Sequence, residues 1–127
     1  MDLRLSAAAI RQASAEPAAL ARLRAVLDEH HLAAYTLNAF PLAPFQVDGA
    51  KTAVYQPDWA GTERLALTTA LIELHLALCD EPVLTISTLP LGYQGDGCRH
   101  ERVAECAANL GRWAARAAQA RQRHDRR

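Results

Sequence analysis

The spacing of apolar residues along the chain predicts four helices, and the first two lie close together in sequence. A short helix is expected over residues 6–15. After it, Pro17 suits the first turn of a helix, and leucines recur three and four residues apart from Leu20 to Leu27. The second helix should therefore begin at Pro17 and end near His30.

The two later helices differ in how much of their surface is apolar. Thr62 can cap a helix that has leucine and isoleucine around most of its circumference, so this helix should be largely buried, with His75 inside it. The last helix begins near His100 and is amphipathic. Its apolar face is expected to contain Val103, Cys106, Leu110, Trp113 and Ala117. Its solvated face is expected to contain Arg102, Glu105, Asn109, Arg112, Arg116 and Arg123.

Two short apolar runs between the helices predict strands. Residues 33–39 and 83–89 contain few charges, and a proline soon after each run, Pro41 or Pro90, ends the strand. Strands that alternate with long helices indicate right-handed βαβ units and a parallel sheet, with both strands buried on both faces. Residues 1–5 resemble only the last turn of a strand that enters a helix. The expected fold class is α/β.

A long connection, from Phe40 to Gly61, follows the first predicted strand and shows no sustained helical or strand periodicity. Such a connection is typical of a lid, a binding loop or disorder. Most of the chain's aromatic residues lie between Tyr35 and Trp59, which disfavours a solvated linker. Within this segment, Asp58 is expected to pair with nearby Arg64 and to close the loop onto the helix.

Composition mainly excludes classes of function. The chain has 127 residues, half of them apolar, which is enough to bury one core. Fourteen basic and fourteen acidic residues balance, which argues against a general polyanion binder, and no nucleic-acid partner is expected. The arginines from Arg112 to Arg127 could touch RNA or an anionic membrane, although cations at the end of a helix are favourable without any partner. Three cysteines without a Cys-x-x-Cys pair support neither a disulfide framework nor a zinc site. We expect a cytoplasmic protein, since no stretch predicts a signal peptide or a membrane span.

Several motifs, in order along the chain, resemble one known family. The matching positions are 35–41, Phe45, Lys51, 54–59, Arg64 and 86–93. Together they resemble the N-terminal part of the metabolite traffic protein EboE family, which is similar to xylose-isomerase-like, sugar phosphate isomerase-type TIM barrels. The pattern departs from the family at residues 42–46, which weakens the transfer of ligand contacts in that loop.

The resemblance implies a partial TIM (β/α)8 barrel, with about two parallel strands and three to four helices. Residues 1–127 would form one incomplete barrel segment that lacks the first strand and everything from the fourth strand onward. The complete parent would bind or traffic a small metabolite and could perform isomerase-type chemistry. A divalent metal in that parent would have its acidic ligands outside this chain. The isolated chain is expected to be inactive and to self-associate through open sheet edges.

The candidate substrate-binding residues follow the predicted strands, because parallel α/β proteins bind ligands at the carboxyl ends of their strands. Asn38, Ser87 and Thr88 could form hydrogen bonds with a hydroxylated ligand, or serve only the local backbone. Trp59 and Tyr93 could form apolar walls of the same site. The long loop could fold Trp59 back over the strand ends as a lid.

Lys51 is the sixth candidate, because it is the chain's only lysine and lies in the long loop. There it could meet a phosphate or a carboxylate, although most lysines are simply solvated. No residue is assigned a catalytic role or a role as metal ligand. Two alternatives to the barrel segment stay open: a non-catalytic binding or assembly module, and a non-functional truncated product.

Overall fold

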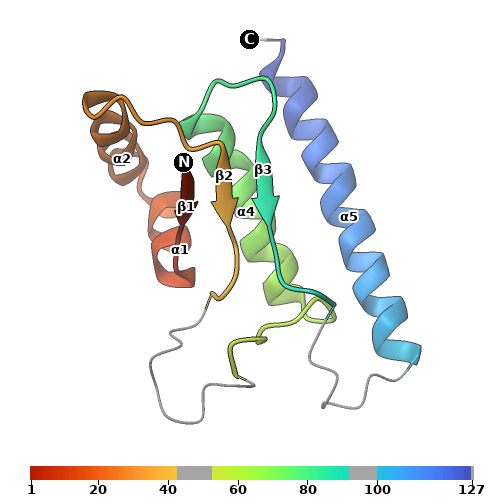
Figure 1. Ribbon diagram of the computed structural model, residues 1–127. Helices are drawn as coiled ribbons and strands as arrows, with labels where there is room; N and C mark the ends of the chain where they lie inside the picture. Colours follow the sequence, from red (N-terminus) through yellow and green to blue (C-terminus); the bar gives the residue numbers. More distant parts are fainter. Residues whose placement is uncertain (43–52, 92–99, 127) are drawn as a thin grey trace.

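The computed structural model describes residues 1–42, 53–91 and 100–126 (Figure 1). The elements, in chain order, are β1 (Asp2–Arg4), α1 (Ala7–Ala15), α2 (Pro17–Glu29), β2 (Thr36–Asn38), α4 (Thr62–Leu78), β3 (Thr85–Ser87) and α5 (His100–His124). The described part of the chain is therefore an α/β structure, as predicted, with a small parallel sheet and four helices.

The sheet has three strands in the order β1-β2-β3, and both pairs are parallel. The sequence predicted about two strands, and this number is wrong because Asp2–Arg4 pairs with β2. A three-residue strand is too short for an alternating pattern to be recognised, so its pairing partner defines it. The resemblance implied that the first strand of the sheet was lacking. The structure instead has a strand, β1, before β2.

The described helices form one layer against one face of the sheet, with α4 behind the strands (Figure 1). Leu3, Leu37 and Ile86 occupy the same register position in the three strands and pack into the main apolar cluster. The other side of this cluster consists of helix residues, including Ile10, Leu27, Leu67, Leu71 and Leu74. The core therefore lies between the sheet and the helices.

The opposite face of the sheet is polar and open to solvent. Side chains alternate between the two faces of a strand, so the neighbours of Leu3, Leu37 and Ile86 all point away from the helices. These neighbours are Asp2, Arg4, Thr36, Asn38, Thr85 and Ser87, and each is exposed or half-buried. The expectation that the strands are buried on both faces is therefore wrong. We call this surface the open face.

The buried helix predicted after the long loop is α4. It begins at Thr62, but its N-cap is Gly61 and no side chain caps it, so the predicted role of Thr62 is wrong. The predicted burial is confirmed, because leucine and isoleucine side chains around most of the helix, together with His75, are enclosed. The helix packs against α1, α2 and α5, which explains why its sequence is apolar on nearly every side.

The last helix, α5, follows the predicted amphipathic pattern in part. Cys106 is buried and Leu110 and Trp113 pack into a second apolar cluster, but Val103 remains 38% exposed. Asn109 was placed on the solvated face, and that placement is wrong. Its amide is buried and its Nδ2 donates a hydrogen bond of 2.8 Å to the carbonyl oxygen of Trp59.

Acidification is expected to destabilise the protein through His75. Its Nε2 donates to the carbonyl oxygen of Ala34 at 2.7 Å, since a carbonyl can only accept. Burial lowers the pKa of His75 below its ordinary value of 6.5, and the bond to Ala34 opposes this only in part. The unfolded chain therefore binds more protons, so the free energy of unfolding falls as the pH drops through 6.5 towards the folded-state pKa.

Urea denaturation between pH 5 and pH 8 measures this effect. In the His75→Gln variant the same scan should lose this contribution, because glutamine does not titrate. An equal loss of stability on acidification in both proteins would show that other groups are responsible.

Candidate functional site

The three strands end together at one edge of the sheet, because all of them are parallel (Figure 1). The last residues of the strands are Arg4, Asn38 and Ser87, and they are register partners. Register partners point to the same face, so these three side chains form one row across the carboxyl edge of the open face. Asn38 and Ser87 therefore lie next to each other at the ends of adjacent strands, as predicted. Arg4, which was not among the candidate residues, is the third member of the row.

Asn38 is held on two sides. Its Oδ1 accepts a hydrogen bond of 2.9 Å from the backbone N–H of Phe40, and its Nδ2 donates to Oδ2 of Asp2 at 3.4 Å. The first bond ties down the turn after β2, which is the local role that its sequence also allowed. The second bond brings the carboxylate of Asp2 beside the row.

Ser87 and Thr88 have different environments. Ser87 exposes its side chain on the open face, while its backbone oxygen accepts a hydrogen bond of 2.9 Å from the N–H of Ala39. Thr88 is half-buried, and its enclosed Oγ1 has no hydrogen-bond partner within the described residues. Of these two candidates, Ser87 is thus the one whose side chain is exposed on the open face.

Trp59 is a core residue. Its side chain is 1% exposed and packs with Leu65, Leu89 and Cys106 in the second apolar cluster. The ring of Trp113 meets it edge-on, with 6.3 Å between centroids. This burial does not fit the expected lid over a ligand.

Lys51 and Tyr93, the remaining candidates, lie outside the described residues. Their proposed contacts with a ligand therefore stay predictions. Phe40, which follows β2, packs partly buried against the same cluster as Trp59.

The expected ion pair between Asp58 and Arg64 does not form. Asp58 instead pairs with Arg102 of α5, and its Oδ1 accepts a hydrogen bond of 3.1 Å from the N–H of Ala60. Sequence proximity favoured Arg64, but the packing of α4 against α5 brings Arg102 to the carboxylate.

Arg64 has a structural role beneath the carboxyl edge. Its side chain is fully enclosed, Nη1 donates to the carbonyl oxygen of Ala39 at 2.7 Å, and Nε donates to that of Pro57 at 2.7 Å. Burial lowers the pKa of Arg64 to about 10, which the charges of Asp58 and Glu63 partly oppose. The guanidinium thus joins the end of β2 to the segment that precedes α4.

A second polar row lies behind the first on the open face. It consists of Asp2, Thr36 and Thr85, which are also register partners. The hydroxyls of Thr36 and Thr85 are hydrogen-bonded at 2.7 Å. The two rows together offer hydroxyls, one amide, one carboxylate and one guanidinium, which suits hydrogen bonding to a polar ligand.

Metal binding has no support in the described part of the chain. No group of three or more histidine, cysteine, aspartate or glutamate side chains is placed there to hold an ion. Across the same residues, no helix combines the length and the apolar character needed to cross a membrane.

Comparisons with known proteins give no relative: no family model matches the chain, and no match was found among curated proteins or solved structures. The resemblance to EboE proteins therefore rests on the sequence motifs alone.

Proposed function

We propose that this chain is a segment of an EboE-like, xylose-isomerase-like TIM-barrel protein, and that its open face binds a small hydroxylated metabolite. Adjacent strands in chain order, with the described helices on one face, support this architecture. A doubly wound sheet has helices on its second face only beyond the point where its strand order reverses. In a barrel the open face would line the interior, and the carboxyl edge would form the mouth where ligands bind.

The observation that supports metabolite binding best is the row of Arg4, Asn38 and Ser87 at the carboxyl edge. A guanidinium, an amide and a hydroxyl on three neighbouring strands can bind several oxygen atoms of one ligand. The guanidinium also favours a ligand with a phosphate or a carboxylate group. A sugar, or its phosphate, has this combination of groups.

Isomerase-type chemistry is proposed only for a complete parent protein. Such chemistry requires a positioned base or a bound metal ion. The described residues contain no metal-binding cluster, and the one carboxylate beside the row, that of Asp2, already accepts a hydrogen bond from Asn38. The chain itself is thus proposed to bind its ligand without converting it.

Titration of the 15N-labelled chain with xylose and with ribose 5-phosphate tests the proposal. We expect shifts of the backbone amide signals of Arg4, Asn38 and Ser87, with tighter binding of the phosphate. In Ser87→Ala the loss of one hydrogen bond should weaken binding by about two- to tenfold. The matched control is Ser14→Ala, because Ser14 lies on α1 and bonds to the backbone oxygen of Ile10.

Two results would contradict the proposal. One is the absence of shifts at the carboxyl edge with either ligand. The other is an equal effect of the Ser87 and Ser14 substitutions on affinity.

A further inference from the structure

The outer edge of β3 has backbone groups that point away from the sheet. In a parallel strand the N–H and C=O of one residue point to the same side, and successive residues alternate. The N–H of Thr85 donates to the oxygen of Tyr35, and the oxygen of Ser87 accepts from Ala39, so both point to β2. Ile86 therefore directs its N–H and C=O to the opposite side. Among the described strands, only β2 pairs with β3.

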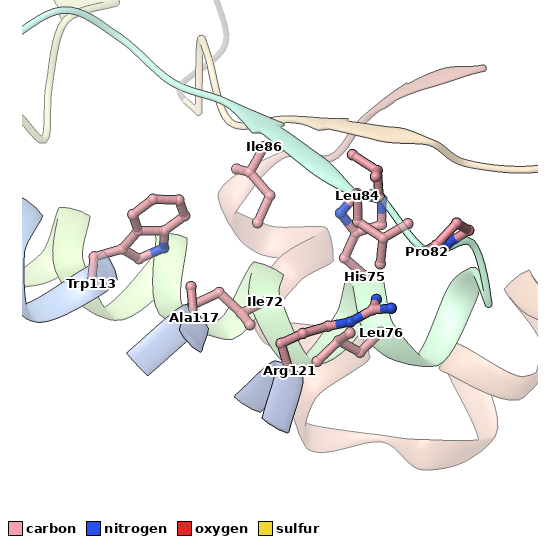
Figure 2. Close-up of a pocket in the computed structure, with 10 residues that line it drawn as sticks. Ile72, His75, Leu76, Pro82, Leu84, Ile86, Trp113, Ala117 and Arg121 are labelled. Carbon is pink, nitrogen blue, oxygen red and sulfur yellow. The ribbon is translucent and has the colours of Figure 1, made fainter. Parts of the chain in front are cut away.

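An apolar cavity of about 310 Å³ lies directly below this edge, between β3, α4 and α5 (Figure 2). Its apolar lining includes Ile72, Leu76, Leu84, Ile86, Trp113 and Ala117. In Figure 2, Ile86 points from the strand towards the space that Ile72 and Trp113 border. The cavity is therefore continuous with the apolar side of the sheet.

The polar groups that border the cavity already have partners. Arg121 forms an ion pair of 3.0 Å with Asp125 and also donates to the carbonyl oxygen of Glu81. The ring of His75 is hydrogen-bonded to the carbonyl oxygen of Ala34. An occupant of this cavity is thus selected by apolar side chains and not by a charge, which disfavours a ligand with an anionic head group.

We infer that the edge of β3 and the cavity form a strand-addition site for an extended peptide segment with alternating apolar and polar side chains. Its backbone would pair with Ile86 and continue the ladder of β1, β2 and β3. Its apolar side chains would enter the cavity, and its polar side chains would extend the open face.

The pattern of the segment follows from the strands already present. Each of them reads polar, apolar, polar, with the apolar residue on the helix side and the polar residues on the open face. The outward N–H and C=O of Ile86 can both be satisfied by another extended chain that lies parallel to β3. This inference does not depend on metabolite binding at the carboxyl edge, and it agrees with the proposed architecture, in which a further strand would pair with β3 at the same edge.

Amide hydrogen exchange measured by NMR tests the inference on the complete chain. The probe is a blocked octapeptide of alternating valine and threonine, flanked by lysines for solubility. Exchange at Ile86 should slow by at least about tenfold when the probe binds, because this N–H gains a partner. Exchange at Thr85 should change little, because its N–H is already bonded to Tyr35. The control peptide has proline at its two central positions and should give no protection.

A pair of variants tests the cavity separately. Ala117→Phe places a ring in the cavity and should weaken binding of the probe by at least about tenfold, because the apolar side chains of the peptide lose their space. Ala115→Phe is the matched control, since Ala115 lies on an exposed side of the same helix. It should leave the affinity unchanged, and circular dichroism should show that both variants are folded.

Three outcomes would overturn the inference. The first is unchanged exchange at Ile86 with saturating probe. The second is protection of Ile86 that rises with protein concentration without any peptide, which would make a second copy the occupant. The third is protection by laurate but not by the peptide, which would make the cavity a site for an amphiphile.

Discussion

Replacing Arg64 with alanine is expected to lower the free energy of unfolding by about 3–5 kcal/mol. The side chain is fully enclosed and donates to the backbone oxygens of Ala39 and Pro57. The variant would leave these two acceptors without their donor and would create a cavity below the carboxyl edge. Urea denaturation, monitored by circular dichroism, measures the change.

Arg11→Ala is the matched control for Arg64→Ala. Arg11 pairs with Glu63 at 2.6 Å, but both side chains are more than half exposed, so the pair should contribute only about 0–1 kcal/mol. A similar, small effect of both substitutions would show that the enclosed guanidinium does not hold the carboxyl edge together.

Replacing Trp59 with alanine is expected to cost a similar amount, about 3–5 kcal/mol, because a large enclosed side chain is removed from the second apolar cluster. Trp59→Phe should cost less. Phenylalanine fills part of the space, and no hydrogen bond is lost, since the indole Nε1 has no partner within the described residues. Tyr35→Ala is the exposed aromatic control, at 48% exposure.

Measuring both the unfolding free energy and the ligand affinity of these variants distinguishes a packing role of Trp59 from a ligand-binding role. A packing residue changes the unfolding free energy and leaves the affinity of the folded protein unchanged. If Trp59→Ala instead keeps its stability and loses affinity for ribose 5-phosphate, the tryptophan is a lid and its burial is not its main role.

The helices could be predicted well because their apolar periodicity extends over many residues. Pro17 begins α2 as predicted, and α4 and α5 begin at Thr62 and His100. The pattern is repeated over several turns in each helix, so a few exceptions do not hide it. The strands β2 and β3 also fall within the predicted runs, although each is shorter than its run.

Features that depend on pairing over long distances in sequence could not be predicted in this way. Asp58 forms its ion pair with Arg102 and not with the nearby Arg64. Asn109 is buried, and its amide donates a hydrogen bond to the carbonyl oxygen of Trp59. Both contacts depend on how α5 packs, which no local pattern encodes. The exposure of the open face could not be predicted from the sequence. Each strand has too few residues for its alternation of polar and apolar side chains to be recognised.

The candidate site was predicted in part. Asn38 and Ser87 are neighbours at the carboxyl edge, because parallel pairing of two predicted strands is enough to bring them together. Arg4 was missed, since residues 1–5 were not recognised as a paired strand. Trp59 was interpreted as a lid from its place in a long loop, and only its packing shows that it belongs to the core.

Asp58 joins α5 to the segment that precedes α4. Its carboxylate binds Arg102 of α5 and the N–H of Ala60, and its backbone oxygen accepts from Gly61 at the start of α4. We therefore expect that a displacement of α5 by an added strand would also shift the segment that Arg64 joins to the end of β2. Thermodynamic linkage would make this coupling reciprocal. An added strand would change the affinity of the protein for a metabolite at the carboxyl edge, and the metabolite would change the affinity for the strand by the same factor.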